Sequence, residues 1–315
     1  MKCVILDDYQ QVAMSMADWS ILKEVETVSI STHLEGQELV EAIKDAEILV
    51  IMRERTPFDA LLLEQLPKLK LLITSGMRNA SIDLQAAKKH GIIVCGTQSH
   101  SEPPTELAWA LILGLARNLP LENNNFQNGG PWQSTIGADL YGKQIGLLGL
   151  GKIGTKMATI AKAFGMKVVA WSQNLTKEQT EQHGVELASS KEELLRTSDF
   201  VSIHLVLSDR TRGLIGKQEL QWMKPSAYLI NTSRAQIVDQ EALVQALEDK
   251  WIAGAGVDVF ELEPLPMDHP FRELPNLLAT PHLGYVTKRN YEGYFHGAVQ
   301  NIQAFLEGRV IRELL

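Results

Sequence analysis

The sequence predicts an α/β protein with two domains, each a doubly wound parallel sheet, and a cleft between the domains. Its 315 residues exceed what one ordinary hydrophobic core accommodates, which favours two domains. Short apolar runs alternate with amphipathic segments from one end of the chain to the other, a rhythm typical of parallel sheets covered by helices. A glycine-rich turn at residues 149–154 lies near the start of a second series of such segments.

A first sheet is predicted from four short apolar runs, at residues 4–6, 48–51, 71–74 and 92–95. Amphipathic segments between these runs predict helices over 38–44 and 83–89, and Gly91 is placed to end the second helix. A second sheet is predicted from six further runs, at residues 145–148, 168–171, 200–203, 228–230, 256–259 and 277–279.

Two longer helices are predicted to link the two parts. The first covers residues 105–117 and is apolar on nearly every face, so we expect another domain or another subunit to bury it. Trp109 and Leu113 on this helix predict a homodimer. The second helix covers 291–306, and its return to the first sheet would make the domains 1–101 plus 285–315 and 102–284. The polar stretches 123–125 and 129–131 predict a loop.

Composition excludes several classes of protein. The formal net charge of −8 argues against a nucleic-acid surface, which needs clustered Lys and Arg. No apolar stretch approaches the roughly 18 residues of a membrane span, so we expect no membrane contact. Cys3 and Cys95 lie in apolar runs and predict buried, reduced thiols. No cluster has metal-ligand spacing, so we expect no metal. The apolar run at the N-terminus is too short for a signal peptide, so we expect a cytoplasmic enzyme.

The glycine-rich turn reads Gly149-Leu150-Gly151-Lys152-Ile153-Gly154, between a predicted strand and a predicted helix. In this context the pattern is typical of a Rossmann-like dinucleotide site, where glycines let the backbone approach a pyrophosphate at a helix N-terminus. We therefore expect residues 102–284 to form the dinucleotide-binding domain. A carboxylate is expected at the end of the next strand if only NAD(H) is used, but Ser172 and Gln173 stand there. The choice between NAD(H) and NADP(H) stays open.

Three charged residues follow strands of the second sheet: Arg234, Glu263 and His282. Ligands of open α/β sheets bind at the carboxyl ends of strands, so these side chains are candidates for catalysis. With the motifs around them and the lead-in 137–143, the chain closely resembles the D-isomer specific 2-hydroxyacid dehydrogenase family. The resemblance covers nearly the whole chain.

The resemblance implies a role for each candidate. Arg234 would hold a substrate carboxylate and polarise its 2-oxo group, His282 would exchange a proton with the oxygen, and Glu263 would pair with His282. Thr232 and Asp258 would lie on the cofactor side. The first part of the chain, 1–101 plus 285–315, would be the substrate domain.

The resemblance also implies that Gly76, Met77 and Arg78 offer backbone N–H groups to the substrate carboxylate. The family often carries Gly-x-Gly there, and Gly where this chain has Ala235. Arg53, with its neighbour Arg55, resembles the phosphoglycerate dehydrogenase branch. These cations predict a substrate with a second anionic or strongly polar group.

The main hypothesis is an enzyme that interconverts small D-2-hydroxy and 2-oxo acids, such as glyoxylate, hydroxypyruvate or 3-phosphohydroxypyruvate, by hydride transfer. A rival is an NAD(H)-sensing binding protein like the corepressors that share the fold. A sensor needs no proton donor, so the set of Arg234, Glu263 and His282 favours the enzyme. Formate dehydrogenase is disfavoured, because formate oxidation releases no hydroxyl proton and needs no Glu-paired histidine.

Overall fold

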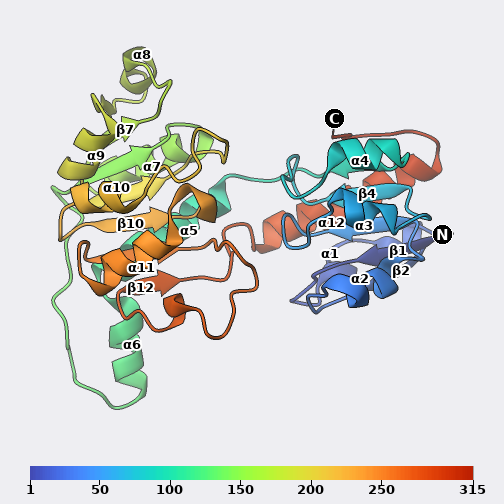
Figure 1. Cartoon of the computed structure of the whole chain (residues 1–315), viewed down its shortest axis with the longest axis horizontal. Helices are drawn as coiled ribbons and strands as arrows, with labels where there is room; N and C mark the ends of the chain where they lie inside the picture. Colours follow the sequence, from blue (N-terminus) through green and yellow to red (C-terminus); the bar gives the residue numbers. More distant parts are fainter. Residues whose placement is uncertain (315) are drawn as a thin grey trace. The chain divides into compact units, whose positions relative to one another are not determined.

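The computed structural model describes residues 1–314 and divides into two compact units. Unit 1 comprises Met1–His100 and Val286–Leu315, and unit 2 comprises Ser101–Tyr285. Each unit is an α/β layer structure with its own parallel sheet (Figure 1). The expected fold class, two α/β domains built on parallel sheets, is thereby confirmed.

Unit 1 has a five-stranded sheet in the order β2-β1-β3-β4-β5, in which all neighbouring strands are parallel. The strands are β1 (Lys2–Ile5), β2 (Glu26–Ser29), β3 (Ile48–Ile51), β4 (Leu71–Thr74) and β5 (Ile93–Gly96). The helices are α1 (Ala13–Met16), η1 (Trp19–Ile21), α2 (Gly36–Ile43), α3 (Ala60–Glu64), α4 (Leu84–Lys89) and α12 (Lys288–Leu306).

Side-chain caps fix where several helices of unit 1 begin. Asp59 accepts a hydrogen bond from the Leu62 N–H at the start of α3, and Asp83 accepts one from Ala86 at the start of α4. Such caps satisfy N–H groups that the first turn of a helix leaves without a partner. Gly91, with a φ of 70°, follows α4 as expected.

Unit 2 has a seven-stranded parallel sheet in the order β12-β11-β10-β9-β6-β7-β8. The strands are β6 (Gln144–Leu148), β7 (Lys167–Trp171), β8 (Glu186–Leu187), β9 (Phe200–Ile203), β10 (Tyr228–Asn231), β11 (Gly254–Val257) and β12 (Leu277–Ala279). The chain order reverses between β6 and β9, which is the switch point where Rossmann folds bind dinucleotides.

Helices of unit 2 connect these strands and cover the sheet (Figure 1). They are α5 (Glu102–Ala116), α6 (Leu119–Gln127), α7 (Lys152–Ala163), α8 (Lys177–Glu181), α9 (Lys191–Thr197), α10 (Lys217–Trp222), η2 (Ala235–Ile237), α11 (Gln240–Glu248) and η3 (Pro270–Arg272). None of the helices in residues 1–314 has the length and apolar character needed to cross a membrane.

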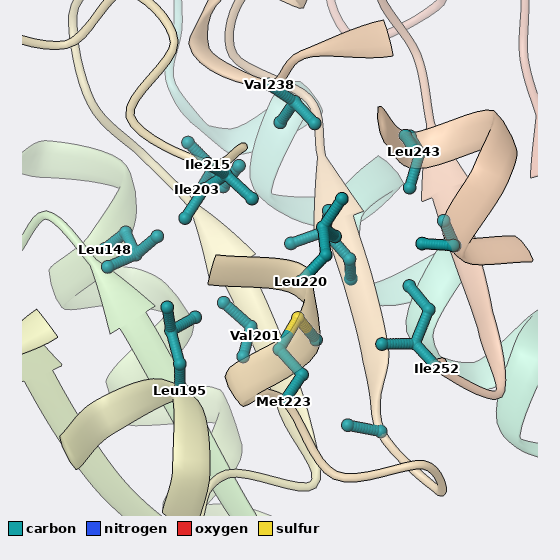
Figure 2. Close-up of a cluster of buried hydrophobic side chains, with 14 of the residues drawn as sticks. Leu148, Leu195, Val201, Ile203, Ile215, Leu220, Met223, Val238, Leu243 and Ile252 are labelled. Atoms are coloured by element: carbon teal, nitrogen blue, oxygen red, sulfur yellow. The ribbon is translucent and has the colours of Figure 1, made fainter. Parts of the chain in front are cut away.

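The core of unit 2 lies on both faces of its sheet. Figure 2 shows one side, where Val201 and Ile203 of β9 meet Leu220 of α10 and Leu243 of α11. A second cluster lies around α5 and α7 and includes Leu147 of β6. A sheet buried on both faces explains why its strands are continuous apolar runs rather than alternating ones.

Residues 105–117 are largely buried, but the expectation that another domain or subunit buries them is wrong. Helix α5 packs within unit 2, where Trp109 is 5% exposed and its ring centroid lies 5.1 Å from that of Phe164. Residues 123–125, expected in a loop, belong instead to α6. Exposed apolar side chains gather on α6 and the segment after it: Leu119, Leu121, Phe126, Trp132 and Ile136.

Candidate active site

The glycine-rich turn lies at the switch point of the unit 2 sheet. A Cβ on Gly149 would lie 2.7 Å from the His204 carbonyl oxygen, and a Cβ on Gly154 would lie 2.2 Å from the Gly149 oxygen. Only glycine therefore fits at these two positions. Gly149 also has a φ of 101°, which other residues rarely adopt.

Gly151 differs from its neighbours because a Cβ there would meet nothing within 4 Å. It is the N-cap of α7, and no side chain caps the helix there. Lys152 and Ile153 form the first turn, with Lys152 exposed and Ile153 half-buried. An uncapped helix N-terminus beside open space suits an anion, so the turn fits the pyrophosphate of a dinucleotide.

The end of β7 lies beside this turn, since the Gly149 N–H donates to the Trp171 oxygen at 2.9 Å. Ser172 follows and is half-buried, whereas Gln173 is exposed. Both residues therefore lie at the strand end where the adenosine ribose binds in Rossmann folds. Neither carries a charge that would repel a 2′-phosphate.

His282 and Glu263 form a close pair. The distance from His282 Nδ1 to Glu263 Oε2 is 2.6 Å, and the two side chains are 18% and 25% exposed. Glu263 is itself fixed, because its Oε1 accepts a hydrogen bond from the Phe260 N–H at 2.9 Å. The Tyr285 ring packs edge-on against His282 at 5.3 Å. With Nδ1 engaged, Nε2 is the nitrogen that can exchange a proton with a ligand.

Asp258 holds the loop that carries His282. Its Oδ1 accepts hydrogen bonds from the Thr280 hydroxyl (2.6 Å) and the Leu283 N–H (2.7 Å), and its Oδ2 accepts one from the Gly284 N–H (2.8 Å). Burial raises the pKa of Asp258, although these bonds and the nearby His282 act in the opposite direction. The carboxylate thus bridges the ends of β11 and β12.

Arg234 follows β10, the next strand of the sheet. The backbone around it is fixed by Asn231, whose amide donates to the Arg234 oxygen at 3.0 Å and accepts from the Ser233 N–H at 3.1 Å. Arg234 Nη1 donates to the Ser233 oxygen at 2.7 Å. Thr232, in the same turn, is half-buried. Arg234 and Asp258 follow adjacent strands, because the Asp258 N–H donates to the Asn231 oxygen.

The predicted substrate residues lie in unit 1 at the ends of β3 and β4. Arg53 Nη1 would lie 2.8 Å from a Cβ on Gly76, so a side chain there would displace the guanidinium from its present position. The Gly76 N–H donates to the Thr97 hydroxyl oxygen at 3.1 Å. Met77 and Arg78 follow and are exposed.

Sequence reasoning missed the residues that hold these groups in place: Thr280 and Asn231 in unit 2, and Ser75, Asn79 and Thr97 in unit 1. Asn231, Ser75 and Thr280 gave a signal, because each is a polar residue directly after a predicted apolar run. Among residues 1–314, no three His, Cys, Asp or Glu side chains gather as a group that could hold a metal ion.

A Rossmann dinucleotide turn and a Glu-paired histidine at the same sheet edge define a nicotinamide-dependent dehydrogenase. Residues 109–284 match the family model for the NAD binding domain of D-isomer specific 2-hydroxyacid dehydrogenases. The chain belongs to this family, which confirms the predicted family, enzyme class and NAD(H) or NADP(H) cofactor.

Relatives of known name agree with this assignment. The chain is 38% identical over 283 residues to a glyoxylate reductase of Aeropyrum pernix, covering 86% of this chain and 83% of the relative. It is 36% identical over 298 residues to a D-3-phosphoglycerate dehydrogenase of Methanocaldococcus jannaschii, covering 94% of this chain but only 56% of that longer relative. A crystal structure of a phosphoglycerate oxidoreductase from Vibrio cholerae superposes with a TM-score of 0.94, at 37% identity, covering 98% and 99% of the two chains.

Proposed function

We propose that this enzyme reduces a small 2-oxo acid to the D-2-hydroxy acid, and catalyses the reverse oxidation, with the residues of unit 2 as its catalytic groups. The observation that carries the proposal is the 2.6 Å contact between His282 and Glu263. This contact engages Nδ1 and fixes the imidazole ring, which leaves Nε2 as the nitrogen that exchanges a proton with the substrate.

The catalytic roles follow from the contacts. The planar guanidinium of Arg234 suits the substrate carboxylate and the adjacent 2-oxo group, which it orients and polarises. Nε2 of His282 gives its proton to the 2-oxo oxygen during reduction and takes it back during oxidation. Glu263 orients the imidazole and stabilises its charge. The bound nicotinamide supplies or accepts the hydride.

The loop after β4 supplies further substrate contacts. Because the Gly76 N–H is already donated to Thr97, we assign the carboxylate-binding role to the N–H groups of Met77 and Arg78. Gly76 contributes by leaving room for the Arg53 guanidinium, which we assign to the substrate as well. A substrate with a second anionic group fits this set of cations.

Either cofactor fits the end of β7. Ser172 can hydrogen-bond a ribose hydroxyl but cannot repel a 2′-phosphate, and Lys177 nearby is 80% exposed and paired with Glu181. We propose that NADH and NADPH are used with efficiencies within about tenfold, or roughly 1.4 kcal/mol. Thr232 and Asp258 would lie on the nicotinamide side.

The decisive experiment is a screen of 2-oxo acids with NADH and NADPH, followed by the loss of absorbance of the reduced cofactor. We expect turnover of glyoxylate, hydroxypyruvate or 3-phosphohydroxypyruvate. Tight binding of NADH without turnover of any 2-oxo acid would favour a corepressor-like sensor instead.

We also propose that the chain forms a homodimer through α6 and residues 128–137. Its exposed apolar side chains include Phe126 and Trp132, whose rings lie 6.1 Å apart. No charged residue occurs between Glu122 and Asp139, and Glu122 is bonded within the segment to Ser134 and Thr135. A two-fold interface places a patch against itself, so an uncharged patch suits it. Light scattering should give a dimer at micromolar concentration, and Trp132→Asp should give a monomer.

A cytoplasmic location is part of the same proposal. Cys3 and Cys95 are free and buried, and burial raises the pKa of their thiols to about 12 and about 11. Thiols held in the protonated form fit a reducing compartment. Fractionation of the native cells, with the chain detected by antibody, tests this location.

A further inference from the structure

Arg53 has an unusual backbone for a non-glycine residue. It follows β3 with a φ of 51°, in the left-handed region. Long side chains rarely adopt this conformation, and it persists only where the surrounding contacts enforce it. The contacts that enforce it should therefore be found around Arg53.

Two side chains of the loop after β4 supply these contacts. Ser75 Oγ accepts a hydrogen bond from the Arg53 N–H at 2.9 Å, and Asn79 Nδ2 donates one to the Arg53 oxygen at 2.6 Å. The N–H and the carbonyl oxygen of Arg53 are thus both hydrogen-bonded by the loop after β4. Ser75 and Asn79 are 3% and 9% exposed, so little water competes for these bonds.

Asn79 is itself fixed in orientation. Its amide also donates to Thr74 Oγ1 at 3.0 Å, and its Oδ1 accepts from the Ser81 N–H and hydroxyl at 2.9 and 2.8 Å. The acceptor bonds from Ser81 identify which end of the amide carries the nitrogen. The amide nitrogen therefore faces Arg53.

Neighbouring residues also fix the position of the Arg53 side chain. Its Nε lies 3.4 Å from Glu54 Oε2, and its positive charge acts on the buried Tyr294 hydroxyl, opposing the rise in pKa that burial causes there. Nη1 lies against Gly76, where a side chain would collide with it. The guanidinium is thus fixed beside the loop to which we assigned the substrate carboxylate.

Arg55, by comparison, has a structural role in unit 1. Its guanidinium donates to the Asp7 oxygen at 2.5 Å and to the Tyr291 hydroxyl at 3.2 Å, and it lies 4.3 Å above the Tyr9 ring. These contacts tie β1, β3 and α12 together. Arg53 instead lies against a glycine loop, with its backbone held by two side chains.

We propose that Ser75 and Asn79 are positioning residues, which hold Arg53 so that it binds a second anionic group on the 2-oxo acid substrate. The proposal rests on the proposed function, which already assigns Arg53 to the substrate, and adds the residues that place its guanidinium. Neither Ser75 nor Asn79 needs to touch the substrate, because each acts through the backbone of Arg53.

The test compares two substrates in the full-length enzyme. Glyoxylate has one carboxylate, whereas 3-phosphohydroxypyruvate carries a second anion. Asn79→Ala should raise KM for 3-phosphohydroxypyruvate by about 10- to 100-fold, because a misplaced Arg53 loses its hydrogen bond to the second anion, with kcat within about threefold. KM for glyoxylate should change by less than about threefold. Ser75→Ala should act in the same direction and serves if Asn79→Ala folds poorly.

Two further variants separate positioning from general damage. Ser81→Ala removes a hydroxyl bonded to the same Asn79 but leaves both bonds to Arg53, so it should resemble wild type. Asn79→Ala added to Arg53→Ala should cause no further rise in KM, because Asn79 acts through Arg53.

Equal losses for both substrates, or additive losses in the double variant, would overturn the proposal. So would Arg53→Ala with an unchanged KM for 3-phosphohydroxypyruvate. If wild type reduces glyoxylate but not 3-phosphohydroxypyruvate, the proposed function survives and this inference fails. If wild type reduces no 2-oxo acid at all, the proposed function itself fails.

Discussion

Asp258→Asn is the most informative single change, because it alters one atom of a buried carboxylate whose hydrogen bonds go to the loop of His282 and not to its ring or to Glu263. The carboxylate receives three hydrogen bonds from the loop that carries His282. In the amide, the new NH₂ group fits best at the Oδ2 position, where it faces the Gly284 N–H. The Gly284 N–H, which donates to Oδ2 in the wild type, would then face another donor and lose its acceptor.

The magnitude follows from these contacts. A buried donor left without an acceptor costs about 1–3 kcal/mol, and hydrogen bonds to a charged group contribute about 1.5–3 kcal/mol each. We therefore expect Asp258→Asn to lower the free energy of unfolding by about 2–4 kcal/mol. A shift of the loop by about 1 Å would also lower kcat by about 100-fold, since proton transfer needs close alignment.

The assay is urea unfolding followed by circular dichroism, together with kcat for reduction of the best 2-oxo acid. Asp239→Asn is a matched control, because Asp239 caps α11 at the surface and Asn is an equally good cap. The control should keep wild-type stability and kcat. If Asp258→Asn loses less than about 0.5 kcal/mol and keeps kcat within threefold, the carboxylate does not hold the catalytic loop.

Four further predictions test individual groups. His282→Ala should lower the reduction rate by about 10²–10⁴, and a loss under threefold would show that His282 is not the proton donor. Arg234→Lys should be severe in kcat/KM, because an ammonium group cannot make two parallel hydrogen bonds; near wild-type turnover would make Arg234 a distant charge. Ser172→Asp should shift the kcat/KM ratio of NADH to NADPH towards NADH, and a wild-type preference of about 100-fold for either cofactor would place the choice outside this strand end. Burial lowers the pKa of His204 from 6.5 to about 4, so its stabilising effect is present above pH 6.5 and is lost as the pH falls to 4. Wild type should lose about 3 kcal/mol more than His204→Gln between pH 7 and pH 4 in urea unfolding, and equal losses would contradict the shift.

Apolar runs predicted most strands of both sheets, and the exceptions have physical reasons. β2 and β8 were missed because β2 is an edge strand without a buried residue and β8 is only two residues long. The strand expected at 256–259 lies at Gly254–Val257, because two glycines weaken its apolar signal. Gly256 lets α5 pack closely on the strand, since a Cβ there would lie 3.1 Å from Leu111 of α5.

Residues that follow strands could be predicted as site candidates, whereas the contacts that hold them in place could not. His282 and Glu263 each follow a strand, and the structure brings them together. Thr280 and Asn231 matter because of what lies beside them in space, on strands far apart in sequence. The sequence also could not show that the Gly76 N–H is engaged by Thr97.

His282 of unit 2 and Arg53 of unit 1 share an unusual backbone conformation, and both have a proposed role in the reaction. Both follow a strand, both are non-glycine residues in the left-handed region, with φ values of 53° and 51°, and each lies next to polar side chains from a neighbouring strand end. Glycine would adopt either backbone without strain but would lose the side chain that the proposed chemistry needs. Strain that persists at such positions is a reason to look for function, provided that the contacts enforcing it are identified. Asp258 acts on the loop of His282, and Ser75 acts on Arg53. We therefore infer that these supports serve to place the two side chains and do not act on stability alone.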